Sequence, residues 1–345
     1  MNVMTVTGSV DIDELGVVLP HEHIISAFDW PGLWPDVSHC PELVWKKVTM
    51  ELLGELKRNY CAIRDNCILN DTAEAIKELE FFKKAGGSTI MEMSTQGLFG
   101  DPLKLREISL KTGVLIIAGT GYYLDQTFSE QVKKMSIEKM YESMMQDITI
   151  GFPGTDVKAG IIGEVGISNF SKAEENSLRA SVRVQKDTGL AINIHVGFSP
   201  ELSRKAIKIL KEEKADFKKI AFAHCDGNSI EFNRELANEG IYVEADCFGN
   251  EWYVDNGAYD GDSAYYFNSD GERVKNIKKL IDAGFVDKIF LSQDICTKTQ
   301  TIQYGGYGYA HLLDNIVPML KYEGVCEEVI SKIMVENPKR FLAGE

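Results

Sequence analysis

Paired cysteines are the first feature that this 345-residue sequence lacks. Its seven cysteines are odd in number and irregularly spaced, and no CxxC pair occurs, which excludes a zinc ribbon and a thioredoxin-type motif. Free thiols in a reducing cytoplasm are therefore expected. The first residues show no basic segment followed by an apolar run, and no stretch approaches the roughly 18 apolar residues of a membrane helix. Neither a signal peptide nor a transmembrane helix is predicted.

Positive charge is also scarce. The 37 Lys and Arg residues stand against 52 Asp and Glu residues, which gives a net charge of −15. This balance, together with the lack of a basic stripe, argues against nucleic-acid and membrane partners. A small-molecule substrate, even an anionic one, stays compatible with it, because bound metal ions can invert the local field. Internal repeats and a glycine-rich phosphate loop are absent too.

What the sequence does contain is a series of eight short apolar runs separated by longer amphipathic segments. Strands of a parallel sheet that is covered on both faces have this continuous apolar character. The alternation predicts an α/β fold, a single (β/α)8 TIM barrel that spans residues 1–345. An open, doubly wound sheet is the alternative, but its first strand should lead into a phosphate loop, and here it ends in HEH. The runs are Val17–Pro20, Ser88–Met93, Val114–Gly119, Ala159–Glu164, Leu190–His195, Ile220–His224, Ile241–Ala245 and Ile289–Leu291.

Three segments lie outside this alternation. Residues 1–15 are expected to form a short hairpin, turning near Gly8, that caps the bottom of the barrel. Long loops follow the first strand (Ile24–Glu74) and the seventh strand (Cys247–Gly271), and both are rich in aromatic residues, Trp252 among them. Loops of this length in a compact domain are usually functional, and both should lie over the catalytic face.

Metal-type side chains gather at the ends of the predicted strands. A single histidine at the end of a strand is more often a core residue, but six such residues on five of eight strands indicate a metal site. Because the strands of a barrel end at one mouth, these side chains should converge there. Four imidazoles and two carboxylates suit two divalent metal ions, Zn by default, with Mn, Co and Fe as alternatives. The six residues are His21, His23, Glu164, His195, His224 and Asp294.

The two other histidines are not expected to be ligands. His39 lies in the first long loop, and His311 follows YGGYGYA on the segment expected to form the last helix. Surface positions, or positions behind the ligands, are predicted for both.

The motifs LPHEH, GIIGEVGIS, NIHVG, AHCDG, SQDI, YGGYGYAHLLDNIVPML and VENPKRFL occur in this order along almost the whole chain. In the order and spacing of these motifs, the sequence resembles the phosphotriesterase family of the amidohydrolase superfamily. Within that family it is similar to the phosphotriesterase-related proteins. The resemblance implies that His21, His23 and Asp294 bind the more buried metal, and His195 and His224 the more exposed one. Glu164 would bridge the two metals, at the position where many members have a carboxylated lysine. By analogy alone, a homodimer is expected.

The resemblance and the ligand set together suggest a mechanism. A hydroxide that bridges the metals attacks the substrate, and Asp294 accepts its proton and delivers it to the leaving group. Asp226 would relay protons or orient a ligand; a helix N-cap before Ser229 is the equal alternative.

Amide, lactone and phosphoester bonds all fit this ligand set, and the resemblance to the phosphotriesterase-related proteins favours a small carboxylic amide or lactone. Cys247 follows Asp246 in the region where triester-hydrolysing members have His and lactonase members have Arg, and a thiol cannot supply a cation. Phosphoester hydrolysis and an inactive, ligand-binding barrel are the alternatives. Further substrate contacts are suggested at Lys298, Tyr122, Tyr123 and Trp252, with a solvated loop lysine and barrel packing as the structural alternatives.

Overall fold

The computed structural model of the chain describes residues 1–29, 41–196, 199–254 and 265–345. Eight strands form one parallel sheet and follow one another around it in chain order. The last strand returns to the first, where the His21 amide donates to Ser292 Oγ at 3.1 Å and the Asp294 amide donates to the His21 carbonyl at 3.3 Å. The predicted (β/α)8 barrel is thus confirmed. Its strands are β3 (Val18–Glu22), β6 (Thr89–Glu92), β7 (Leu115–Thr120), β8 (Ile161–Gly166), β9 (Ile192–His195), β10 (Ile220–Phe222), β11 (Tyr242–Ala245) and β14 (Ile289–Leu291).

Each predicted apolar run overlaps one barrel strand, and nearly every residue in these strands is buried. In β9 the side chains of Ile192 and Ile194 face outward into the core beneath the helices, and the alternate residues Asn193 and His195 face into the barrel. The same alternation delivers polar side chains to the barrel interior while the outer surface stays apolar.

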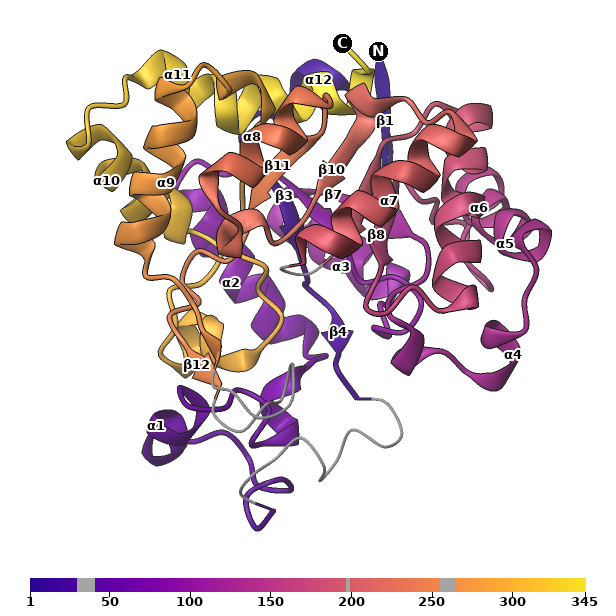
Figure 1. Cartoon of the computed structure of the whole chain (residues 1–345). Coiled ribbons are helices and arrows are strands. Elements are labelled where there is room, and N and C mark those ends of the chain that lie inside the picture. Colours follow the sequence, from indigo (N-terminus) through magenta and orange to yellow (C-terminus); the bar gives the residue numbers. More distant parts are fainter. Residues whose placement is uncertain (30–40, 197–198, 255–264) are drawn as a thin grey trace.

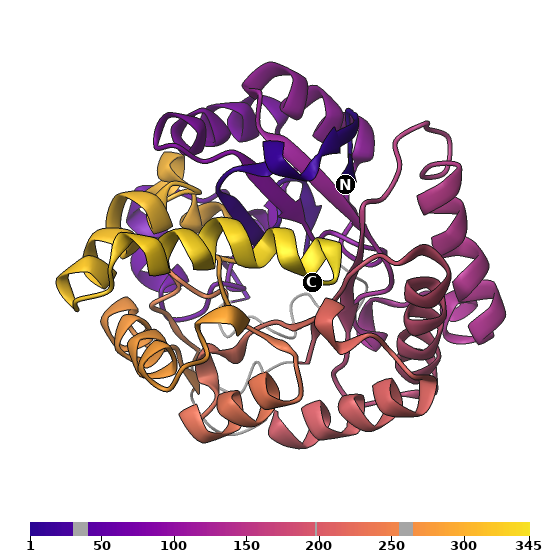
Figure 2. The same cartoon turned by 90° about the horizontal axis from the view of Figure 1, so that it is seen from above.

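A ring of helices covers the outside of the barrel (Figures 1 and 2). The stop and start signals are local: α6 begins after Ser171, whose hydroxyl accepts from the Glu174 amide, and ends at Gly189, which has a φ of 71°. None of the helices in the described part of the chain has the length and apolar character needed to cross a membrane. The helices of the ring are α2 (Thr72–Lys84), α3 (Pro102–Thr112), α5 (Ile137–Thr149), α6 (Lys172–Thr188), α7 (Pro200–Glu213), α8 (Ile230–Asn238) and α9 (Asp270–Asp282), followed by α10 (Val317–Tyr322) and α11 (Glu327–Ser331).

The bottom of the barrel is closed by the two ends of the chain. The predicted hairpin forms from β1 (Asn2–Thr5) and β2 (Gly8–Asp11), and helix α12 (Asn337–Ala343) crosses beside it, as Figure 2 shows. Val3 and Leu15 pack in one apolar cluster with Phe341 and with residues at the starts of the strands. Access to the barrel interior is therefore restricted to the opposite end.

Two long excursions cover that opposite end, at the bottom of Figure 1. The first connects β3 to α2 and contains the antiparallel pair β4 (Ser26–Ala27) and β5 (Ile68–Leu69) and the short helix α1 (Leu53–Leu56). The second follows β11 and contains β12 (Tyr253–Val254) and β13 (Tyr265–Tyr266). The excursions contact each other: the Tyr60 and Trp252 rings stack 4.8 Å apart, and Arg58 Nε donates to the Tyr253 hydroxyl at 3.1 Å. They form one joint cover at the predicted position.

Candidate metal centre

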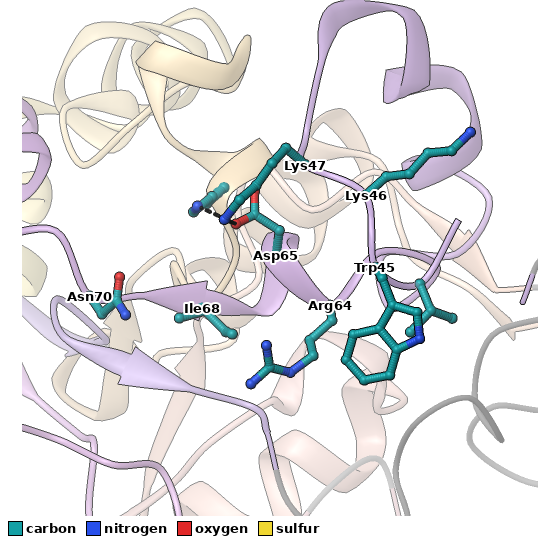
Figure 3. Close-up of a pocket in the computed structure, with 9 residues that line it drawn as sticks. Trp45, Lys46, Lys47, Arg64, Asp65, Ile68 and Asn70 are labelled. Atoms are coloured by element: carbon teal, nitrogen blue, oxygen red, sulfur yellow. Dashed lines mark hydrogen bonds and ion pairs between the residues drawn. The ribbon is translucent and has the colours of Figure 1, made fainter. Parts of the chain in front are cut away.

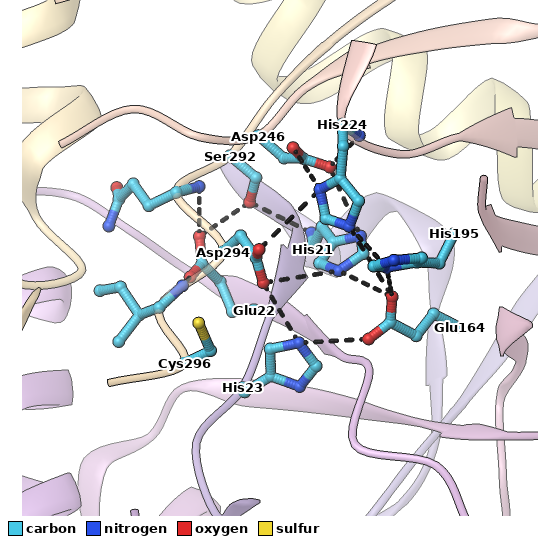
Figure 4. Close-up of polar contacts among 12 residues, drawn as sticks. His21, Glu22, His23, Glu164, His195, His224, Asp246, Ser292, Asp294 and Cys296 are labelled. Atoms are coloured by element: carbon cyan, nitrogen blue, oxygen red, sulfur yellow. Dashed lines mark hydrogen bonds and ion pairs between the residues drawn. The ribbon is translucent and has the colours of Figure 1, made fainter. Parts of the chain in front are cut away.

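The six residues predicted as metal ligands come together at the mouth of the barrel, with His21 between Glu164 and Asp294 (Figure 4). Glu164 Oε1 lies 3.4 Å from His23 Nε2. The other oxygen, Oε2, lies 2.9 Å from His195 Nδ1, 3.6 Å from His21 Nε2 and 4.0 Å from His224 Nε2. One carboxylate therefore faces two pairs of imidazoles, one pair from β3 and one from the ends of β9 and β10.

Asp294 completes the group on the side of β14. Its Oδ1 lies 3.2 Å from His23 Nε2 and 3.7 Å from His21 Nε2. Four sets of ligand atoms in the described residues lie within 4.8 Å of one another and could hold a metal ion, and two of them consist of predicted ligands alone: His21, His23 and Asp294, and Glu164, His195 and His224.

Two observations test whether these residues fit divalent cations. His21 Nε2 is buried and has no hydrogen-bond partner among the described residues, although it faces two carboxylates. His224 Nε2 and His195 Nδ1 approach to 2.7 Å, a distance at which two lone pairs repel unless a proton or an ion lies between them. The donor set, imidazole nitrogen with carboxylate oxygen, is the one that zinc and similar ions prefer. The residues fit such ions.

The charges of the site point the same way. Burial acts to raise the pKa of Glu164, but the imidazoles of His195 and His21 hold that pKa well below its ordinary value. The pKa of Asp294 is likewise lowered, because the effect of burial is outweighed by the hydrogen bond with His23 and by the other imidazoles. Both carboxylates therefore favour the ionised form and cations beside them, either protons on the imidazoles, as the raised pKa of His23 (about 10) indicates, or divalent ions in their place.

A second layer of polar residues holds the imidazoles from behind. Asp246 Oδ1 lies 2.9 Å from His224 Nδ1, and Glu244 Oε2 lies 3.3 Å from His21 Nδ1. His23 Nδ1 lies 3.0 Å from Ser94 Oγ. Such contacts fix which ring nitrogen carries the proton and turn the other nitrogen toward the centre of the site. Sequence analysis missed these three residues, although an acidic residue inside a buried strand was an available signal.

Asp226 is not the N-cap of the following helix, so that alternative is wrong. Ser229 caps α8, its hydroxyl accepting from the Phe232 amide. Asp226 Oδ2 instead accepts from the amides of Asp246 and Cys247, at 3.0 and 3.2 Å, and so holds the end of β11 in place. Cys247 is buried, and its thiol points to Asp246 Oδ1 at 3.4 Å.

The residues suggested as substrate contacts differ in where their side chains point. The Tyr123 ring lies 5.1 Å from that of His195 and so borders the site, whereas the Tyr122 hydroxyl points to the Met135 sulfur, in the core beneath the helices. Trp252 stacks on Tyr60 within the joint cover. Lys298 is not a solvated loop lysine: its side chain is 13% exposed and its Nζ lies 3.0 Å from Asp65 Oδ1.

Of the two histidines set aside, His39 lies outside the described residues. His311 is buried, so the alternative of a surface position is wrong; its Nε2 lies 2.7 Å from Asp270 Oδ2, and its ring stacks on that of Tyr307. The segment that follows it is not the last helix, because α11 and α12 come later in the chain.

The chain matches known proteins over almost its whole length. The model of the phosphotriesterase family matches residues 1–342. The chain belongs to the phosphotriesterase family. It is 36% identical to the N-acetyltaurine hydrolase of Xenopus tropicalis over 99% of this chain and 97% of that protein. It is 38% identical to the phosphotriesterase-related protein of Nematostella vectensis over 98% of this chain and 97% of that protein.

A solved structure extends the comparison. The resiniferatoxin-binding protein of Rhodobacter sphaeroides superimposes with a TM-score of 0.91 at 31% identity, covering 99% of this chain and 94% of that one. The predicted family is thus confirmed. This phosphotriesterase-family chain is an enzyme, and its class is that of the hydrolases.

Proposed function

We propose that the chain is a two-metal hydrolase that cleaves a small carboxylic amide, with N-acyl derivatives of small anionic amines such as taurine as the substrates to test first. One observation carries this proposal: the Glu164 carboxylate lies among four imidazoles, with Asp294 opposite. The choice of an amide rests on the N-acetyltaurine hydrolases, which are about a third identical over nearly their whole length. A lactone is the second candidate bond.

In this proposal His21, His23 and Asp294 hold one ion, His195 and His224 hold the other, and Glu164 lies between the two. Zinc is expected, with manganese, cobalt and iron as the alternatives. When bound, the ions supply a Lewis acid for the carbonyl oxygen and lower the pKa of a water molecule.

The residues of the chain supply the rest of the chemistry. Asp294 is ionised and, at 16% exposed, is reached by solvent more readily than Glu164, so it is the group best suited to accept a proton and return it to the leaving amine. Tyr123 and Phe28 pack edge-on against the rings of His195 and His23 and exclude water from that side. Asp226 is a positioning residue, because its carboxylate accepts a hydrogen bond from the backbone amide of Asp246.

The proposal is tested by metal content and turnover measured on the same samples. Wild type and Glu164→Ala are analysed for bound elements, with Glu107→Ala on the exposed face of α3 as the matched control. Wild type and the control are expected to hold about two divalent ions per chain, and Glu164→Ala to lose at least one of them. Each is then assayed with N-acetyltaurine, N-acyl amino acids, a panel of lactones and paraoxon.

Turnover of an amide by wild type, lost together with the metal in Glu164→Ala, is the expected result. Turnover of lactones alone would move the assignment to the second candidate bond. A wild-type protein that binds no divalent ion after reconstitution would overturn the proposal.

A further inference from the structure

The excursion between β3 and α2 forms, with the loop after β14, a pocket that the proposed chemistry does not use (Figure 3). It encloses about 300 Å³, and its walls come from three stretches: residues 44–47, residues 64–70 and the loop after β14. The last stretch contributes Lys298, which follows Asp294 by four residues. Their Cα atoms can therefore lie no more than about 14 Å apart. The pocket and the metal centre are thus connected through a short piece of chain.

The walls of this pocket are positive, in a chain whose net charge is −15. Lys46, Lys47, Arg64 and Lys298 carry positive charge, and among the lining residues Asp65 alone is acidic. Arg64 also pairs with Asp29. Four positive charges less two carboxylates leave an excess of two positive charges. A cluster of this kind in an acidic protein creates a local field that attracts anions.

The positive groups are held in place by the protein itself. Asp65 accepts from Lys47 Nζ at 2.6 Å, from Lys298 Nζ at 3.0 Å and from the Val48 amide at 3.1 Å. One carboxylate between two ammonium groups orders both and neutralises only one of them. A preordered cluster loses little conformational entropy when an anion binds.

Two further groups complete the pocket. Lys46 also lines the pocket; it is exposed, and its side chain extends away from those of Lys47 and Asp65 (Figure 3). Trp45 is 71% exposed, and the Arg64 guanidinium lies 5.8 Å from the centre of its ring. An exposed flat ring next to ammonium groups offers an apolar surface for the organic part of a ligand and charge for its anionic end.

We propose that this pocket binds a tetrahedral oxyanion of the sulfonate or phosphate type, held by Lys47 and Lys298, with the charge of Lys46 adding to the local field. Lysine binds such groups as a point charge with three donors, and this suits an anion whose oxygens point in several directions. The oxyanion has two sources: the anionic end of the substrate, which rests on the proposed function, or a free anion.

The binding test uses ethanesulfonate as the probe, because sulfonates are weak metal ligands and do not compete for the metal centre. Isothermal titration of the metal-loaded, full-length chain at low salt compares wild type with Lys298→Gln and with the double variant Lys46→Gln, Lys47→Gln. Lys111→Gln, an exposed lysine of α3 paired with Glu107, is the matched control. Each pocket variant is expected to lower the affinity about tenfold or more, since a hydrogen bond to a charged group is lost.

The control should bind the probe as wild type does. Equal affinity in all variants, or no binding to wild type at millimolar concentrations, would overturn the proposal. The double variant removes two exposed side chains and leaves Asp65 paired with Lys298, so the comparison does not depend on Lys298→Gln folding.

A kinetic test then separates the two sources. If the pocket holds the end of the substrate, Lys298→Gln raises the KM for N-acetyltaurine and leaves the KM for N-ethylacetamide unchanged. If the pocket holds a free anion, both KM values stay the same while probe binding is still lost. A wild-type chain that hydrolyses neither amide would refute the proposed function, and the titration would still decide the binding site.

Discussion

Replacement of Asp246 by Asn tests how strongly the second layer supports the metal centre. Asp246 is fully buried, and each of its oxygens faces His224: Oδ1 lies 2.9 Å from the ring Nδ1, and Oδ2 accepts from the backbone amide at 2.9 Å. Burial acts to raise the pKa of Asp246, but the charge and hydrogen bond of His224 lower it to about 2. Asp246→Asn therefore removes a negative charge at every pH at which the protein is studied.

The magnitude follows from the two hydrogen bonds. Asparagine keeps a single oxygen acceptor, so one of the two His224 donors must face an NH2 group. A hydrogen bond to a charged group contributes about 1.5–3 kcal/mol, and its loss should lower the free energy of unfolding of the metal-free protein by that amount. Without its carboxylate partner, the imidazole is also a weaker and less well oriented ligand. Metal affinity should fall about 10- to 100-fold.

Metal affinity is measured by competition with a coloured chelator, and stability by urea unfolding of the metal-free chain. Asp156→Asn is the control, because it makes the same chemical change at a side chain that is 82% exposed, and it should leave both quantities unchanged. If Asp246→Asn bound zinc as tightly as the control, the contact with His224 would have no part in orienting the ligand, and the reasoning would be refuted.

Three further predictions concern stability. Arg273→Met leaves the buried carboxylates of Asp226 and Asp270 without their guanidinium partner, and it should lower the free energy of unfolding, measured in urea, by about 3–5 kcal/mol. A smaller change would mean that water or a rearrangement of the two carboxylates replaces the guanidinium. Burial raises the pKa of Asp147 from 3.8 to about 6, so the folded chain holds the proton more tightly and loses stability as pH rises between these values. Asp147→Asn should accordingly raise the melting temperature at pH 8 and not at pH 3.5, and an equal gain at both would contradict the assignment. Removal of metal by a chelator should lower the melting temperature and added zinc should restore it, whereas an unchanged melting temperature would mean that folding is not linked to metal binding.

The barrel could be predicted from the sequence because its strands are buried on both faces. A strand such as β14 consists of apolar residues alone, and the intervening helices begin and end at local signals such as Ser171 and Gly189. The position of the joint cover could be predicted from the sequence, but its internal contacts could not. Its contacts, such as Tyr60 with Trp252, connect segments far apart in the chain that no periodic pattern relates.

The six candidate ligands were found because each ends a strand and is of a metal-binding type. The residues behind them were missed for a physical reason: the contact between His21 and Glu244 spans 223 residues, and only the closed barrel brings the two together. A different argument would have indicated them. A carboxylate within or directly after a buried strand is costly unless it has a partner, so Glu92, Glu244 and Asp246 each imply a buried partner.

The stacked rings of Tyr60 and Trp252 have a consequence for how this enzyme can change over evolution. They join two segments that follow different strands of the barrel, and each ring is part of the packing surface of the other. A substitution in one segment therefore alters the shape of both, and the effects of substitutions on the two sides should not add. A new substrate range would be reached more readily by paired changes, one in each segment, than by drift in either alone.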